Sequence, residues 1–311
     1  MKKLIPIITM PTWWVTDDTN YGSLFQAYAL QKILRSEGYE PEWVQYDIPE
    51  VNDKLSFRWQ QLYRCLRWPR RLIGRSKRQK VHKSFKASHP RYFEEFIRTR
   101  LSVSETVFKS EEELRAWYVD CYAAIVGSDQ MWISSQPHYF LSFVPAYKRV
   151  AYAVSAPWGQ RNKTWKENLK SGASQIPALS VREKEGVDLL YHMGVKHAVQ
   201  TLDPVLLLDS RMWYELAKER SSNCRTSGPY ALGYFLNGYC LDDICWQGIK
   251  RFIKDKNYLL KAIPNQGTEA FLPADVMIAP PPAEFLALFR DCECVITNSF
   301  HAAVFAIIFE K

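Results

Sequence analysis

Apolar runs alternate with helix-period segments over most of the 311-residue sequence. Short apolar runs between turn residues favour buried strands, whereas apolar residues at every third or fourth position favour amphipathic helices. This pattern predicts strands over residues 4–9, 42–47, 122–127, 149–155, 178–182 and 199–202, and helices over 23–37, 183–193 and 211–218. Such alternation is typical of βα units built around a parallel sheet.

A second series of elements begins after a small, polar stretch at residues 221–229. It comprises strands over 230–236, 258–263 and 294–297, and helices over 241–254, 282–289 and 300–309. The chain length fits two domains. We therefore predict an α/β protein with two Rossmann-like domains, at residues 1–225 and 226–311.

The last predicted helix is apolar on every side except at His301. A helix of this kind is expected to be buried all round. No later element is present to cover it, because the sequence stops at Lys311. We therefore expect the second domain to be incomplete at its C-terminal end, with an exposed apolar face on this helix.

The composition is that of an ordinary globular protein, with 47% hydrophobic and 24% charged residues. The longest apolar run, 302–309, is far shorter than the ~18 residues that span a bilayer. The apolar N-terminus lacks a small-residue cleavage site and is interpreted as the first strand. The seven cysteines form no CxxC pair, so we predict reduced thiols, no metal site and a cytoplasmic location.

Residues 51–100 are strongly basic and aromatic. They hold 15 Lys and Arg against three acids, a balance of +12, whereas the whole chain carries +8. The segment interrupts the βα alternation, so we interpret it as a helical insertion in the first domain. A basic, aromatic helix favours an anionic surface such as membrane lipid, a phosphate-bearing substrate or nucleic acid. The alternative is a solvated face whose aromatic side chains pack inward.

Two predicted loops follow strands at the edge where parallel sheets bind ligands. Asn20, Tyr21 and Gly22 precede the first helix, whose backbone N–H groups suit an anion. The sequence has no GxGxxG or P-loop motif, and a structural helix start explains this turn equally well. Ser128 and Asp129 suit the hydroxyls of a sugar, with Trp132 as a stacking surface. A turn capped by Asp129 is the alternative.

Two further candidates end later strands. Arg182 offers a bidentate guanidinium for a carboxylate or phosphate, or else forms a surface ion pair with Glu183 or Glu185. Asn298 and Ser299 precede the last helix, which Ser299 is expected to cap. His301 then lies in the first turn, where the helix dipole favours the neutral imidazole that accepts a proton. A hydrogen-bonded core histidine is the alternative.

The ordered set of motifs resembles the polysaccharide pyruvyl transferase family. The resemblance covers nearly the whole chain and rests on NYGSLFQAYALQKIL, AAIVGSDQMW, YFLSFV with RVAYAVS, SVREKEGVDLL, LDPVLLL and TNSFHAAVF. It implies two glycosyltransferase-B-like domains and transfer of a pyruvyl group from phosphoenolpyruvate to a sugar, usually as a cyclic ketal. It also implies His301 as catalytic acid or base and Arg182 as an anchor for the donor. Some members carry an arginine two residues before the histidine, whereas this sequence has Ser299.

The expected activity is pyruvyl transfer to a sugar of a surface polysaccharide, exopolysaccharide or capsule precursor. The acceptor is a sugar or lipid-linked oligosaccharide, and no metal or redox cofactor is required. Residues 51–100 are expected to contact an anionic membrane peripherally, at its inner face, and no nucleic acid is expected. A sugar-nucleotide glycosyltransferase of the same architecture is the alternative enzyme. A nucleic-acid-binding or membrane-binding protein acting through residues 51–100 is the alternative from another class.

Overall fold

The computed structural model describes residues 3–12, 15, 20–48, 80–159, 161–219, 228–236, 240–265 and 267–311. Contacts divide them into two compact units. The first unit contains the described residues of Met1–Asp17, Ser23–Val51 and Glu94–Leu208. The second unit contains those of Asp18–Gly22, Asn52–Phe93 and Asp209–Lys311.

The described part of the first unit contains a seven-stranded parallel sheet, in the order β3-β2-β1-β4-β5-β6-β7. Its strands are β1 Leu4–Ile8, β2 Glu40–Tyr46, β3 Val103–Phe108, β4 Ala124–Val126, β5 Arg149–Val154, β6 Ala178–Val181 and β7 Val199–Gln200. Central strands such as β1 and β4 are buried along most of their length. A continuous apolar run is what a strand covered on both faces requires.

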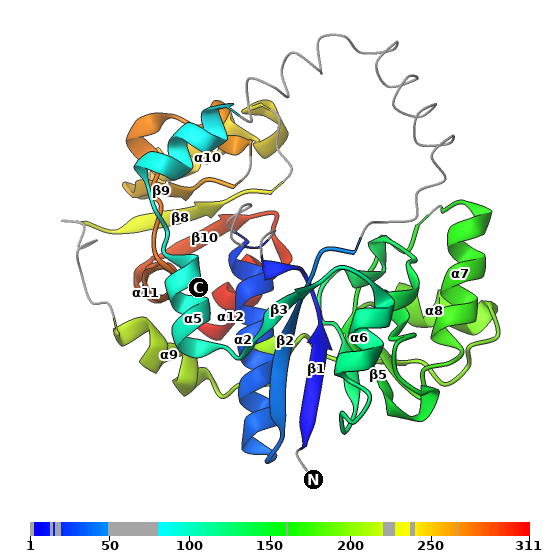
Figure 1. Ribbon diagram of the computed structural model, residues 1–311. Helices are drawn as coiled ribbons and strands as arrows, with labels where there is room; N and C mark the ends of the chain where they lie inside the picture. The colour runs from blue at the N-terminus through cyan, green and yellow to red at the C-terminus, as the bar shows by residue number, and fades with distance from the viewer. Residues whose placement is uncertain are drawn as a thin grey trace. The chain divides into compact units, whose positions relative to one another are not determined.

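Helices cover both faces of this sheet. Figure 1 shows α2 (Tyr21–Ser36) and α5 (Phe93–Arg100) on one side, with α6 (Glu111–Trp117), α7 (Lys163–Ala173) and α8 (Lys184–His192) on the other. The connections run from β1 outward in one direction and from β4 outward in the other, so right-handed crossovers place their helices on opposite faces. Short 3₁₀ turns complete the unit: η1 Met131–Ile133, η2 Pro137–Phe140, η3 Ala146–Lys148 and η4 Pro204–Leu206.

The six strands and two helices predicted for this sheet are confirmed, with shifted ends. The pattern misses β3, α6 and α7. Strand β3 lies at the edge of the sheet and exposes three consecutive residues, so it lacks a continuous apolar run. Helices α6 and α7 are short and start at the polar caps Ser110 and Asn162. Because these helices begin at polar residues and expose most of their surface, they contain too few apolar residues to show the helical period.

The described part of the second unit contains a three-stranded parallel sheet in the order β10-β8-β9. The strands are β8 Tyr230–Tyr234, β9 Leu259–Ile263 and β10 Cys294–Thr297. Around it lie α9 Ser210–Lys218, α10 Trp246–Lys256, α11 Pro282–Asp291 and α12 Phe300–Ile308, and residues 80–88 are also helical. The turns η5 Asp242–Ile244, η6 Thr268–Ala270 and η7 Ala274–Val276 connect them. All the elements predicted after residue 229 are therefore present.

Helix α9 groups with the second unit, although the sequence pattern predicts the domain boundary after it. The reason is packing, because Trp213 of α9 lies edge-on against Phe305 of α12, with ring centroids 5.2 Å apart. The predicted boundary at residues 225 and 226 lies outside the described residues, as does most of the predicted basic insertion, 51–79. Within the rest of that insertion, residues 80–88 and α5 are helical.

The last helix, α12, buries one face and exposes another. Ala302, Val304 and Phe305 are buried, whereas Phe300 is 43% and Ile307 is 71% exposed. The expected exposed apolar face is therefore present. Within the described ranges, no helix is both long enough and apolar enough to cross a membrane.

Candidate functional site

The direction of strand order reverses between β1 and β4 in the first unit. Open parallel sheets bind ligands at such a switch point, outside the carboxyl ends of the strands. Thr9 follows β1 there, and Ser128 and Asp129 follow β4. Gly127 permits the turn after β4: it has a φ of +113°, and a Cβ at this position would lie 2.2 Å from the carbonyl oxygen of Tyr152.

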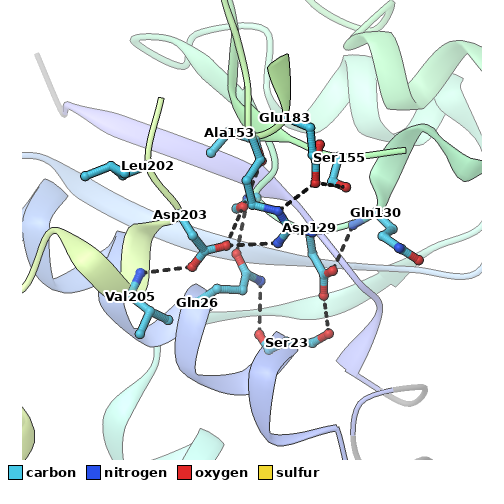
Figure 2. Close-up of polar contacts among 12 residues, drawn as sticks. Ser23, Gln26, Asp129, Gln130, Ala153, Ser155, Glu183, Leu202, Asp203 and Val205 are labelled. Atoms are coloured by element: carbon cyan, nitrogen blue, oxygen red, sulfur yellow. Dashed lines mark hydrogen bonds and ion pairs between the residues drawn. The ribbon is translucent and has the colours of Figure 1, made fainter. Parts of the chain in front are cut away.

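Buried hydrogen bonds join these strand ends (Figure 2). The side chain of Gln26 donates from Nε2 to Thr9 Oγ1 at 2.9 Å, and its Oε1 accepts from the backbone N–H of Ser128 at 3.1 Å. Ser128 Oγ lies 2.9 Å from both the carbonyl oxygen of Ala153 and Oδ2 of Asp203. The loop after β4 is therefore held by β1, α2, β5 and the segment after β7.

Asp129, predicted to bind a sugar, is bonded to the protein itself. Its Oδ2 accepts a hydrogen bond from Ser23 Oγ, and its Oδ1 accepts from the backbone N–H of Gln130 at 2.9 Å. This is the capped turn given above as the alternative. Trp132 is fully buried, and its Nε1 donates to the carbonyl oxygen of Tyr139 at 2.9 Å. The expectation that Trp132 stacks on a sugar is therefore wrong, because its ring lies in the core.

Arg182 follows β6, as predicted, and its guanidinium binds two carboxylates. Nη1 lies 3.1 Å from Asp203 Oδ2, and Nε lies 3.0 Å from Glu183 Oε1. Burial alone would lower the pKa of Arg182, but Asp129, Asp203 and Glu183 together raise it above its usual range. The pair with Glu183 is partly buried, since the Arg182 side chain is 8% and the Glu183 side chain 31% exposed. Arg182 thus holds two loops together at this edge.

Several residues of this cluster were not singled out from the sequence. Glu183 also accepts hydrogen bonds from Ser155 Oγ at 2.7 Å and Trp158 Nε1 at 2.8 Å. Asp203 is buried, and its Oδ1 accepts from the backbone N–H of Val205 at 3.0 Å. The sequence feature that could have identified Asp203 is its position directly before Pro204, just after the end of a predicted strand.

The carboxyl edge of the second sheet carries the last predicted motif. Ser299 caps α12, as expected, because its Oγ accepts from the backbone N–H of Ala302. Asn298 is exposed, and its side chain forms two 2.7 Å hydrogen bonds with the backbone of Leu236, just beyond β8. Asn298 therefore braces the loop after β8. His301 lies in the first turn of α12 and is half-buried.

Gly22 lies directly against His301. A Cβ added to Gly22 would stand 2.2 Å from Nδ1 and 2.5 Å from Cγ of the imidazole. No side chain fits there, so only glycine allows this approach. The two motifs, 279 residues apart in the sequence, are thus joined within the second unit.

The turn preceding α2 is shorter than predicted. Helix α2 begins at Tyr21 rather than Ser23, so Tyr21 and Gly22 belong to its first turn and half-buried Asn20 precedes it. Tyr21 is fully buried, its ring stacks on Phe285 at 4.0 Å, and its hydroxyl donates to the carbonyl oxygen of Pro280 at 2.5 Å. These contacts fix the position of the helix start.

The predicted site residues therefore form two groups. Ser128, Asp129 and Arg182 lie together in the first unit. Tyr21, Gly22 and His301 lie together in the second, where Asn298 and Ser299 shape the same strand end. Among the described residues, no cluster of three His, Cys, Asp or Glu side chains could hold a metal ion.

Residues 20–311 match the family described as polysaccharide pyruvyl transferase. The chain belongs to this family. The match includes every residue of both groups, so the resemblance noted from the motifs is confirmed. Membership indicates a polysaccharide pyruvyl transferase.

A solved structure supports the fold of this family member. The UDP-GlcNAc 2-epimerase from Methanocaldococcus jannaschii superposes with a TM-score of 0.53 at 10% sequence identity, covering 100% of this chain and 82% of that chain. At this identity the likeness concerns the fold alone. It confirms the predicted glycosyltransferase-B-like, two-part α/β architecture. No match to the chain was found among curated proteins.

Proposed function

We propose that the protein transfers a pyruvyl group from phosphoenolpyruvate to a sugar of a surface-polysaccharide or exopolysaccharide precursor, forming a ketal. The family match over residues 20–311 is the observation that carries this proposal. The position of His301, in the capped first turn of α12 and against Gly22, supports it. The reaction needs a group that handles protons at a fixed position.

The chemistry balances without an oxidant or reductant. One sugar hydroxyl attacks C2 of the enol while C3 gains a proton and becomes the methyl group. A second hydroxyl then bonds to C2 as the C2–O bond to phosphate breaks, and its proton leaves with phosphate. Both additions require a base near the attacking hydroxyl and an acid near C3 or the leaving oxygen. In this proposal His301 serves as that acid or base.

The roles proposed for the other residues follow their contacts. Asn298 and Ser299 position His301, since they fix the loop after β8 and the start of α12. The side chains of Ser128 and Asp129 are buried and bonded to the protein, so their proposed role is to shape the acceptor-binding loop at the switch point of the first unit. Arg182 is better suited to hold Asp203 and Glu183 in place than to bind a donor, because its guanidinium already binds both carboxylates.

Phosphate release from phosphoenolpyruvate, measured across a panel of sugar acceptors, tests this function. We expect release only with an acceptor, and we expect His301→Ala to lower kcat by about 10²–10⁴-fold, the usual contribution of general acid–base catalysis. His192→Ala is the matched control, because His192 is an exposed histidine on α8. Unaltered turnover by folded His301→Ala would exclude the assigned role.

A parallel assay with nucleotide sugars addresses the alternative enzyme. Transfer of a glycosyl group, with no phosphate release from phosphoenolpyruvate under any condition, would replace the proposed reaction by glycosyl transfer.

A further inference from the structure

Arg91 is a buried arginine in the second unit that the site described above does not use. It follows the helical residues 80–88 and is only 6% exposed. Its Nη2 donates to the carbonyl oxygen of Pro264 at 2.7 Å. Its Nη1 is buried and has no hydrogen-bond partner among the described residues. One end of this guanidinium is therefore unsatisfied.

No carboxylate in the described part of the chain forms an ion pair with Arg91. Burial raises the pKa of the Tyr21 hydroxyl, Arg91 partly opposes that rise and Glu284 adds to it, yet Glu284 makes no ion pair with Arg91. His82, by contrast, lies buried 2.8 Å from Glu269 in the same unit. A buried charge without a counter-ion is costly, and proteins usually pair such a group or bind a ligand with it.

A second unsatisfied donor lies nearby. Tyr234, the last residue of β8, is 2% exposed, and its buried hydroxyl has no partner among the described residues. Both groups border Tyr21: the Arg91 guanidinium carbon lies 5.5 Å from the centre of the Tyr21 ring, and the Tyr234 ring centre lies 6.1 Å from it. Burial raises the pKa of the Tyr234 hydroxyl, and Arg91 partly opposes that rise. The Arg91 guanidinium and the Tyr234 side chain therefore lie in the same buried region around Tyr21.

The location matches the carboxyl edge of the second sheet. Tyr234 ends β8, Pro264 directly follows β9, and Tyr21 adjoins Gly22, which touches His301. Ligands of parallel sheets bind at this edge. The Arg91 Nη1 group and the Tyr234 hydroxyl, which lack acceptors among the described residues, form a set of donors suited to an oxyanion.

We propose that Arg91 and Tyr234 form a binding site for the anionic donor, receiving its carboxylate or phosphate group. This inference rests on the proposed function for the identity of the donor. The guanidinium supplies charge and the Nη1 hydrogens, and the phenol supplies one further hydrogen. Bound in this way, the donor lies in the same unit as His301.

Calorimetric titration of the full chain with phosphoenolpyruvate, without acceptor, tests the site. We expect Tyr234→Phe to weaken binding by about tenfold or more, the cost of a hydrogen bond to a charged group, and Arg91→Met to weaken it further. Arg251→Met is the matched control, because Arg251 is an exposed arginine on α10 of the same unit. Competition by inorganic phosphate would assign the phosphate end to this site, whereas competition by pyruvate would assign the carboxylate end.

Unfolding of the unliganded variants separates binding from a structural role. Tyr234→Phe removes an oxygen that has no partner among the described residues, so we expect unchanged or higher stability and a loss of the Tm increase that phosphoenolpyruvate produces in the wild type. Unchanged affinity in Tyr234→Phe and Arg91→Met would overturn the inference, even if the wild type releases phosphate. If the wild type releases none but binds phosphate through Arg91, the anion site stands and the proposed reaction falls.

Discussion

At the scale of single residues, the contact between Gly22 and His301 is the most informative feature. The sequence identified both residues, from two motifs, but could not show that they touch. Contact between segments so far apart in the sequence is set by tertiary packing, which local patterns do not contain. The absence of a side chain at Gly22 was the only local sign that another group approaches closely.

We expect Gly22→Ala to displace the imidazole of His301. The added methyl group would overlap Nδ1, whereas alanine is itself favourable in a helix. Activity should therefore fall at least about tenfold, through kcat more than through KM, while the helical circular dichroism signal is retained. Gly159→Ala is the control, because nothing lies within 4 Å of a Cβ at that position. If Gly22→Ala were fully active, the contact between the His301 imidazole and Gly22 would not matter for catalysis.

At the scale of elements, the strands were predicted better than the contacts at their ends. Continuous apolar runs such as residues 4–8 define central strands, and the switch point follows from their order. Arg182 was correctly placed at the end of β6, but its partner Asp203 comes from beyond β7. An arginine that binds a ligand and one that binds a buried aspartate look alike in a sequence. Only the packing of neighbouring strand ends distinguishes them.

The buried pair of Arg182 and Asp203 should stabilise the first unit strongly. We expect Asp203→Ala to lower the free energy of unfolding by about 3–5 kcal/mol, because it removes the fully buried one of the two carboxylates that bind the Arg182 guanidinium. Urea unfolding measures this effect. Replacing both residues, as Arg182→Met with Asp203→Leu, should recover part of the loss.

Asp47→Ala serves as the control for that experiment. It breaks the exposed pair with Lys109 in the same unit and should change stability little. Equal effects of Asp203→Ala and Asp47→Ala would mean that the buried pair contributes no more than a surface one.

At the scale of the whole molecule, each unit contains a buried apolar cluster, and the two units should respond differently to acid. Burial lowers the pKa of His138, in the first unit, to about 4 from its ordinary value of 6.5. Below pH 6.5 the unfolded chain binds a proton that the folded chain does not. The contribution of neutral His138 to the free energy of unfolding is therefore fully present above about pH 6.5 and is lost as the pH falls toward 4.

Lowering the pH from 7 to 5 should reduce the free energy of unfolding of the first unit by about 2 kcal/mol through His138. His138→Phe should remove that part of the loss. Hydrogen exchange measured at both pH values reports the two units separately. We expect the variant to retain protection in β1, β4 and β5 at pH 5, relative to wild type, with no difference in β8 and β9. His192→Gln is the control, because His192 is an exposed histidine of the same unit. Identical acid sensitivity of wild type and His138→Phe would refute the assignment.

The cluster around Arg182 also sets the sign of the electrostatic potential at the carboxyl edge of the first sheet. Its single cation is accompanied by the carboxylates of Asp129, Asp203 and Glu183, a formal charge of −2. Coulombic repulsion across a partly buried edge is weakly screened by salt, so a multiply charged anion is disfavoured there. A sugar, which carries hydroxyls rather than charge, experiences no such barrier. If the proposed function holds, this charge favours the neutral sugar acceptor over phosphoenolpyruvate at the switch point of the first unit.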